Sequence, residues 1–169
     1  MKKVLGAVVI TSLLSVSAIN AMNLQGEELT TSKVYKPTKS VIEKTMTKLG
    51  YTYQIDEDGD MLFRLGKGEW KTYLIFDTFS KEKKIWNIQL LAQFSIDPAR
   101  YDELLIYVNK WNVNKKYPKL SIRDKKTLKL SYNYPIQYGF NPDEFEENVL
   151  GIFKTTIDTI TKETYSMRK

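Results

Sequence analysis

The residue types that most often carry out chemistry in proteins are partly missing from this sequence. It contains neither histidine nor cysteine. Histidine is the usual general base at neutral pH and the commonest metal ligand, and cysteine is a strong nucleophile. Triads that need a histidine, thiol chemistry and most zinc or copper sites are therefore excluded. Carboxylate pairs or a Ser-Lys dyad remain available, but no two acids show a convincing spacing, so we expect no enzyme.

One loop is acidic enough to suggest a calcium site, and its spacing argues against one. Residues 56–60 read Asp-Glu-Asp-Gly-Asp. An EF-hand loop needs glycine at its sixth position and glutamate at its twelfth. Counted from Asp56, those positions hold Met61 and Lys67. The pattern therefore predicts a solvent-exposed hairpin turn, and we expect no metal ion and no cofactor.

A second candidate is a basic stretch over residues 110–129, in which Asp124 is the only acid. Strand alternation should turn Leu120 and Ile122 inward and the neighbouring cations outward. One interpretation is a docking surface for an anionic partner, whether an acidic protein, anionic lipid or another polyanion. The alternative is that lysine on an edge strand prevents unwanted strand pairing. The candidate contact residues are Lys115, Lys116, Lys119, Arg123, Lys125, Lys126 and Lys129.

A third candidate is an apolar strand near residues 70–77. Trp70 and Leu74 alternate with Tyr73 and Ile75, so both faces of this strand are partly apolar. Helices that cover one face would leave the other for a protein partner or a second protomer. The plainer alternative is a central strand that is buried on both sides. The candidate protein-binding face comprises Trp70, Tyr73 and Ile75.

The first elements that must position these residues are a helix and a hairpin. The helix is predicted over residues 38–49, with Ser40 and Glu43 spaced as a capping box. In the hairpin, apolar residues up to Ile55 alternate, as do Met61, Phe63 and Leu65, and both sets are expected to face the core. Shared parity requires a loop of odd length, which Glu57-Asp58-Gly59 satisfies with glycine at the left-handed position.

Two longer strands and a second helix follow. The strands span roughly residues 69–79 and 84–95, and Asp97-Pro98 is typical of a helix start. One face of the second strand is apolar and should point to the core: Trp86, Ile88, Leu90, Ala92 and Phe94. The helix should end near residues 112–114.

A second hairpin and a last helix complete the chain. The hairpin needs an odd loop or a bulge around residues 124–126. Asn141 and Pro142 then cap and open a helix with a continuous apolar stripe. The order is α-β-β-β-β-α-β-β-α. Strands that are grouped between helices predict an α+β fold, an antiparallel sheet with helices packed on it.

The N-terminus has the order of parts found in a secretory signal peptide. Lys2 and Lys3 precede an uncharged apolar run over residues 4–16, and small residues follow. We expect cleavage after Ala21, with Ala18 as the second choice. The alternative is a membrane anchor, but a spanning helix needs about 20 apolar residues. The prediction is a signal peptide over residues 1–21 and a periplasmic or secreted protein with no transmembrane segment after cleavage.

The processed chain is predicted to be one domain. Residues 22–37 are polar, end at a proline and are expected to form a flexible leader. Residues 38–169 should form the single folded domain, which is long enough to bury a core.

Export and the lack of a nucleic-acid-binding motif also argue against nucleic acid as a partner.

From about residue 38 to 164 the sequence resembles the YbjN-type domains, whose fold is similar to that of type III secretion chaperones. The resemblance rests on motifs that carry no catalytic group: Gly50-Tyr51, Asp58-Gly59, Asn109-x-Trp111-Asn112, Tyr117, the hairpin from Leu120 to Leu130, and Gly139 before the Asn-Pro cap. The family is labelled a sensory transduction regulator, which implies binding and regulation. Similar chaperones are homodimers, so a homodimer is implied as well. Many relatives are cytoplasmic, whereas this chain is predicted to carry a signal peptide, so a cytoplasmic regulatory role does not transfer.

Two functions follow as expectations. The first is an exported, non-enzymatic binding module, chaperone-like or regulatory, that acts through protein–protein contacts with a partner the sequence does not identify. The second is a peripheral binder of anionic lipid or another polyanion through the basic hairpin over residues 110–129.

Overall fold

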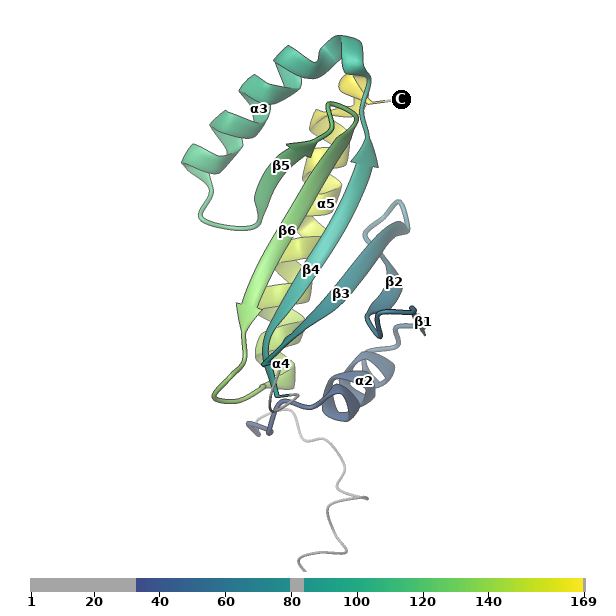
Figure 1. The fold of residues 1–169 in the computed structure, drawn as a ribbon, viewed down its shortest axis with the longest axis vertical. Helices are drawn as coiled ribbons and strands as arrows, with labels where there is room; N and C mark the ends of the chain where they lie inside the picture. The colour runs from purple at the N-terminus through teal and green to yellow at the C-terminus, as the bar shows by residue number, and fades with distance from the viewer. Residues whose placement is uncertain (1–32, 80–83, 169) are drawn as a thin grey trace, which may run out of the picture. The chain divides into compact units, whose positions relative to one another are not determined.

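Six strands form one antiparallel sheet in the order β1-β2-β3-β4-β6-β5 (Figure 1). The computed structural model describes residues 33–79 and 84–168, so the predicted signal peptide lies outside the described residues. The elements are α2 (Lys39–Lys48), β1 (Tyr53–Ile55), β2 (Met61–Leu65), β3 (Trp70–Thr78), β4 (Ile85–Ser95), η2 (Pro98–Arg100), α3 (Tyr101–Asn114), β5 (Lys119–Arg123), β6 (Thr127–Pro135), α4 (Pro142–Glu144), η3 (Phe145–Leu150), α5 (Gly151–Glu163) and η4 (Tyr165–Met167). This confirms the predicted class and order.

The first helix, α2, is capped by a different residue from the one predicted. The side chain of Thr38 accepts a hydrogen bond from the N–H of Val41, while Ser40 lies inside the helix. Thr38 is extended, as an N-cap must be. Pro37, directly before it, disfavours a helical conformation of residue 36, so the helix does not extend further toward the N-terminus. The capping box predicted at Ser40 is therefore wrong by two positions, although the helix itself is confirmed.

Both hairpins close through loops of odd length, as parity requires. Ile55 pairs with Met61, and the N–H of Asp56 donates to the carbonyl of Asp60 across the three-residue loop. Gly59 has φ +81°, the left-handed conformation predicted for it. In the second hairpin Arg123 pairs with Thr127 around residues 124–126. One expectation fails at the sheet edge: Ile55 is 49% exposed, because it lies on the short outer strand β1.

A β-bulge in β4 changes which side chains near the start of this strand face the core. Asp77 pairs with Asn87 and Thr78 with Ile85, which leaves Trp86 without an opposite residue. The extra residue reverses the parity before it. Ile85 is therefore buried at 4% exposure, while Trp86, expected in the core, is 37% exposed.

The C-terminal helix also contains one extra residue in a turn. Asn141 accepts hydrogen bonds from Asp143 and Glu144, as its predicted cap role requires. The stretch η3 is π-helical, and the N–H of Gly151 donates to the carbonyl of Glu146, five residues earlier. The wider turn rotates the apolar stripe so that Leu150 is buried, whereas Ile152 is only half-buried.

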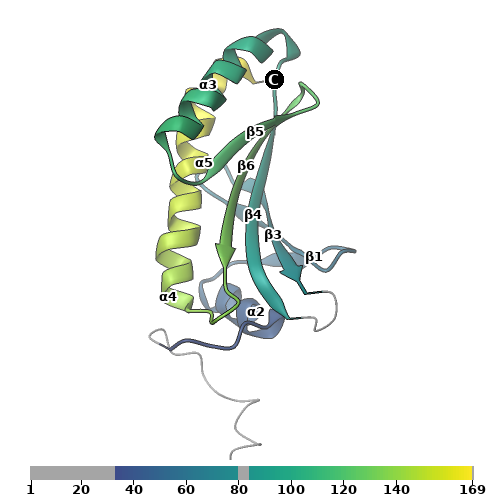
Figure 2. The same cartoon turned by 60° about the vertical axis from the view of Figure 1, so that its left-hand side comes forward.

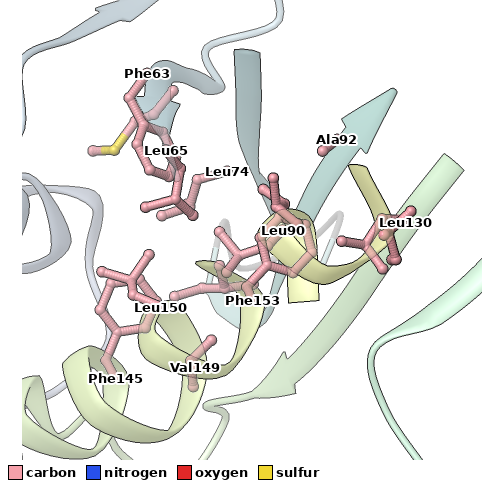
Figure 3. Close-up of a cluster of buried hydrophobic side chains, with 14 of the residues drawn as sticks. Phe63, Leu65, Leu74, Leu90, Ala92, Leu130, Phe145, Val149, Leu150 and Phe153 are labelled. Carbon is pink, nitrogen blue, oxygen red and sulfur yellow. The ribbon is translucent and has the colours of Figure 1, made fainter. Parts of the chain in front are cut away.

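The core lies between the sheet and the helices that cover one of its faces. Figure 3 shows side chains of the C-terminal helix, including Phe145 and Phe153, pointing toward Leu74, Leu90 and Leu130 on the strands. Figure 2 shows α3 and α5 on the same side of the sheet. Tyr107 of α3 donates a hydrogen bond of 2.7 Å to Glu163 of α5, which joins these helices.

The folded unit begins earlier than predicted. Tyr35 forms an isolated antiparallel bridge with Phe140, with N–H to carbonyl distances of 2.8 Å in both directions. A Cβ on Gly139 would lie 2.3 Å from the Val34 side chain, so a glycine permits this close approach. The predicted flexible leader, residues 22–37, is therefore wrong at its C-terminal end; residues 22–32 lie outside the described part.

Candidate functional site

The sheet face opposite the helices carries an apolar row across three strands. Strand register places Leu62 of β2 opposite Tyr73 of β3, and Tyr73 opposite Leu91 of β4. Ile75 follows Tyr73 on the same face. Leu91 is 8% exposed, and Leu62, Tyr73 and Ile75 are half-buried. Among the described residues, α3 and α5 lie on the other side of the sheet (Figure 2), and Leu62, Tyr73 and Ile75 keep part of their surface exposed.

Amide side chains border the apolar row on one side. Ile75 lies opposite Gln89, whose amide donates a 2.9 Å hydrogen bond to Asn133 of β6. One row further, the amide of Asn87 donates to the carboxylate of Asp77 at 2.7 Å. These side-chain pairs run across the strands and hold one another in place.

Cations border the row on the other side. Arg64 pairs with Lys71 across β2 and β3, and the Lys71 ammonium lies 5.3 Å from the centre of the Tyr73 ring. The same sheet face carries Lys129 of β6, opposite Ser121 of β5. Lys119 and Arg123 alternate with inward-facing residues of β5 and are exposed. The structure therefore brings the candidate residues Tyr73 and Ile75 onto one face with Lys119, Arg123 and Lys129.

Trp70 is separated from the other two residues of the predicted protein-binding face. It shares the parity of the buried Leu74, and its ring meets Phe94 edge-on at 5.2 Å on the helix-covered face. The guanidinium of Arg168 lies 5.1 Å from the Trp70 ring. Trp70 therefore does not lie on the sheet face that carries Tyr73 and Ile75.

Several basic residues of the hairpin have structural contacts. The Lys119 ammonium donates to the carbonyls of Asn112 and Lys115 at 3.0 and 2.8 Å, where it satisfies the C-terminus of α3. Lys125 lies over the Tyr101 ring, and Arg123 pairs with its neighbour Asp124 at 3.0 Å.

The other basic side chains of the hairpin differ in their surroundings. Lys115 lies over the Trp111 ring, 5.8 Å from its centre. Lys116 and Lys126 are exposed, and Lys129 is half-buried on the sheet face. The hairpin thus presents positive charge, but fewer of its cations are free to meet a ligand than the sequence suggests.

The free edge of β5 is covered by two side chains of α3. The Asn112 amide donates to the carbonyl of Leu120 at 2.8 Å and accepts from the Leu120 N–H at 3.0 Å. The Trp111 indole N–H donates to the carbonyl of Pro118 at 3.0 Å. These two side chains therefore protect the edge of β5, and the Asn-x-Trp-Asn motif has a structural role.

The acidic loop at the first hairpin uses its carboxylates to hold backbone. Asp56 accepts from the N–H groups of Asp58 and Asp60, and Asp60 accepts from the N–H of Phe76 on β3. Burial raises the pKa of the Asp60 carboxyl, and the hydrogen bond from Phe76 partly opposes this. Within the described residues no three acidic side chains gather in a way that could hold a metal ion.

The sheet face contains functional candidates that sequence reasoning missed. Leu62 and Leu91 complete the apolar row, and Arg64 and Lys71 complete its basic border. A correct register for β2, β3 and β4 could have identified them, since residues directly opposite each other share a face. In the described part of the chain, no helix has both the length and the apolar character that crossing a membrane requires.

Comparisons with known proteins agree with this fold. A family model named YbjN, described as "Putative bacterial sensory transduction regulator", matches residues 38–163. The solved structure described as "Crystal structure of YbjN, a putative transcription regulator from E. coli" is 11% identical, with a TM-score of 0.60. The similarity covers 81% of this chain and 99% of that one, and at this identity it shows the fold alone. A search of the curated proteins finds no match.

Proposed function

The chain belongs to the YbjN family, and from this premise we propose that it is an exported, non-enzymatic module that regulates or chaperones another protein by binding it. The observation that carries the proposal is the uncovered sheet face. Tyr73 lies at its centre, between Leu62 and Leu91, on strands whose other face packs into the hydrophobic core. A rigid scaffold that holds a partly apolar surface in solvent is typical of a binding site.

The charges that border this face define the partner's chemistry. Arg64, Lys71, Lys119, Arg123 and Lys129 all lie on it. Lys119 also donates to the end of α3, and Arg123 pairs with Asp124, so Arg64, Lys71 and Lys129 are the cations that a partner would meet first. The acid on this face, Asp77, is hydrogen-bonded to Asn87. An acidic protein segment with apolar side chains on one face would match both the row and its basic border. The apolar contacts would supply affinity, and the cations would speed association and orient the partner.

Site-specific photo-crosslinking in intact cells tests this proposal. A photoreactive phenylalanine analogue at Ile75 should give a discrete adduct with one protein, and Tyr73→Asp should abolish it by placing a charge in the apolar row. The matched control places the analogue at Lys154, an exposed position on α5. Self-adducts alone, no adduct, or the same adduct from Lys154 would contradict a dedicated partner on the sheet face. A thermal melt confirms that Tyr73→Asp still folds.

A second candidate function is binding of anionic lipid through the hairpin, favoured by the exposed side chains of Lys116 and Lys126. The probes are vesicles of phosphatidylglycerol and of phosphatidylcholine. Binding to the anionic vesicles alone, weakened by salt and by Lys116→Ala/Lys126→Ala, would support this role because exposed charges are screened. Salt-independent binding, or none, would exclude it. Lys154→Ala is the single-charge control.

Export is the part of the proposal that rests on the N-terminal sequence. Cell fractionation should place the protein in the periplasm or the medium. Mass spectrometry of the purified protein should find a new N-terminus after Ala21 or Ala18. An intact Met1 on a cytoplasmic protein would overturn this part and leave the binding function to be judged separately.

A further inference from the structure

A cleft of about 1160 Å³ opens on the side of the molecule away from the uncovered sheet face. Its walls are the turn between β2 and β3, the C-terminal half of α5, and the chain end around η4. The side chains that matter for its chemistry are Lys67, Trp70, Asp158, Lys162, Tyr165 and Arg168. No function assigned above uses this cleft.

The turn between β2 and β3 is held firmly against α5. Gly66 has φ +79°, and a Cβ at this position would lie 2.8 Å from the Asp158 carboxylate. The same carboxylate accepts a hydrogen bond of 2.9 Å from the N–H of Lys67. Lys67 is therefore fixed at the rim of the cleft by its backbone, while its ammonium group stays exposed.

The opposite wall is built around Arg168. Its guanidinium lies 5.1 Å from the Trp70 ring centre and 5.8 Å from that of Phe94, and donates a 2.6 Å hydrogen bond to the carbonyl of Thr161. A backbone bridge between Ile96 and Arg168 anchors the chain end. Stacking on aromatic rings and a carbonyl contact hold the guanidinium in one orientation.

The cleft carries an unbalanced positive charge. Lys67, Lys162 and Arg168 line it, and Asp158 is its single acidic side chain. Among the described residues no carboxylate oxygen lies within 4.0 Å of the charged nitrogens of these three cations. The Arg168 Nε is buried and has no hydrogen-bond partner. Burial also lowers the pKa of this guanidinium, which is the direction expected for a half-buried cation without a counter-ion.

We propose that this cleft binds a small organic anion that carries at least two negatively charged groups. Lys67, Lys162 and Arg168 come from three separate segments and surround one space, so a single charged group would leave part of that charge unmatched. Lysine and arginine both form charge-assisted hydrogen bonds to carboxylate and phosphate oxygens. Trp70 and Tyr165 supply aromatic surface for the organic part of the ligand, and the cleft is large enough to admit a small organic molecule.

The experiment follows the three tryptophan indole N–H signals by NMR while citrate or pyrophosphate is added. Trp86→Phe and Trp111→Phe variants identify the Trp70 signal by elimination. We expect saturable shifts of the Trp70 indole and of the Lys67, Gly68 and Arg168 amides. Citrate tests carboxylate groups and pyrophosphate tests phosphate groups, and acetate at equal ionic strength controls for single charges and salt. No saturable shift with either probe, or equal shifts with acetate, would overturn the proposal.

Matched double variants then test the residues. Lys67→Ala/Lys162→Ala should weaken binding about tenfold, the effect expected from losing two exposed charge contacts. Lys125→Ala/Lys126→Ala removes the same charge from the hairpin and should leave the affinity unchanged. If both double variants weaken anion binding equally, the effect comes from net charge alone and the cleft is rejected as the binding site. Tyr73→Asp should also leave anion binding intact, so failure of the sheet-face function and failure of the cleft can be told apart.

Discussion

The Asn112 side chain forms two hydrogen bonds with the backbone of Leu120, one with its carbonyl and one with its N–H. In doing so, a helix side chain takes the place that another strand would occupy at the edge of β5. The contact ties α3 to the sheet and removes one site at which a second chain could pair. Asn112 thus connects the fold to the question of what this protein binds.

Asn112→Ala should destabilise the fold by about 1–3 kcal/mol, because both Leu120 backbone groups would lose their partner. The free energy of unfolding in urea measures the loss. Asn109→Ala is the control, since Asn109 is exposed on the same helix. A cost no greater than that of the control would show that the contact contributes little.

The bulge in β4 gives a second prediction. Ile85→Ala should cost about 2–4 kcal/mol, the range for truncating a buried aliphatic side chain. Trp86→Ala should cost less than half as much, even though it removes more atoms, because Trp86 is 37% exposed and Ile85 only 4%. Urea denaturation of both variants decides the order. The reverse order would mean that the simple alternation holds in solution.

This pair of residues also shows where sequence reasoning stops. Alternation along residues 84–95 places Trp86 in the core, which is wrong. Beyond the bulge the same alternation is correct, and the residues that it places in the core are all buried: Ile88, Leu90, Ala92 and Phe94. The bulge depends on how β3 is paired with β4, which is information about two strands. Leu150 is a similar case, since one wider turn of the helix shifts the stripe by a residue.

The candidate site residues also fall into those whose position the sequence pattern predicts and those whose position it does not. Parity alone separates Tyr73 and Ile75 from Leu74, and it correctly turns Lys119 and Arg123 outward. Local pattern could not show that Lys119 would satisfy the end of α3, or that Trp70 would pack beneath Arg168, almost a hundred residues later. Contacts of this kind depend on tertiary packing, which the local pattern of a sequence does not reveal.

Two glycines with the same backbone conformation should respond differently to substitution. Gly50 and Gly66 have φ +80° and +79°, but a Cβ at Gly50 would meet nothing within 4 Å, whereas one at Gly66 would approach Asp158. Gly50→Ala should cost about 1 kcal/mol from the left-handed conformation alone. Gly66→Ala should cost about 2 kcal/mol or more, because it also pushes the β2–β3 turn away from α5.

Thermal and urea unfolding compare the two glycine variants directly. The Lys67 amide signal provides a second measurement, because its hydrogen bond to Asp158 should weaken in Gly66→Ala and remain in Gly50→Ala. Equal costs in the two variants would show that the turn has room to adjust, and that α5 does not hold it in place.

Two tyrosine–glutamate pairs predict how stability depends on pH at the alkaline end. Burial, and then a hydrogen bond with Glu163, raises the pKa of Tyr107 above its usual 10. Burial and then Glu144 do the same for Tyr134. A raised folded-state pKa means that each phenol contributes its full stability below the unfolded-state value of 10. That contribution disappears as the pH rises through the higher folded-state value.

Reciprocal substitutions separate the effect of the carboxylates from that of burial. Glu163→Gln should lower the pKa of Tyr107 and leave that of Tyr134 unchanged, and Glu144→Gln should do the reverse. The ring resonances of the two tyrosines, followed by NMR from about pH 9 upward, show which phenol ionises first and how that order changes in each variant. If neither substitution lowers the pKa of its own tyrosine, burial alone keeps the phenols protonated. A change in both tyrosines from one substitution would instead indicate a general loosening of the helix-covered face.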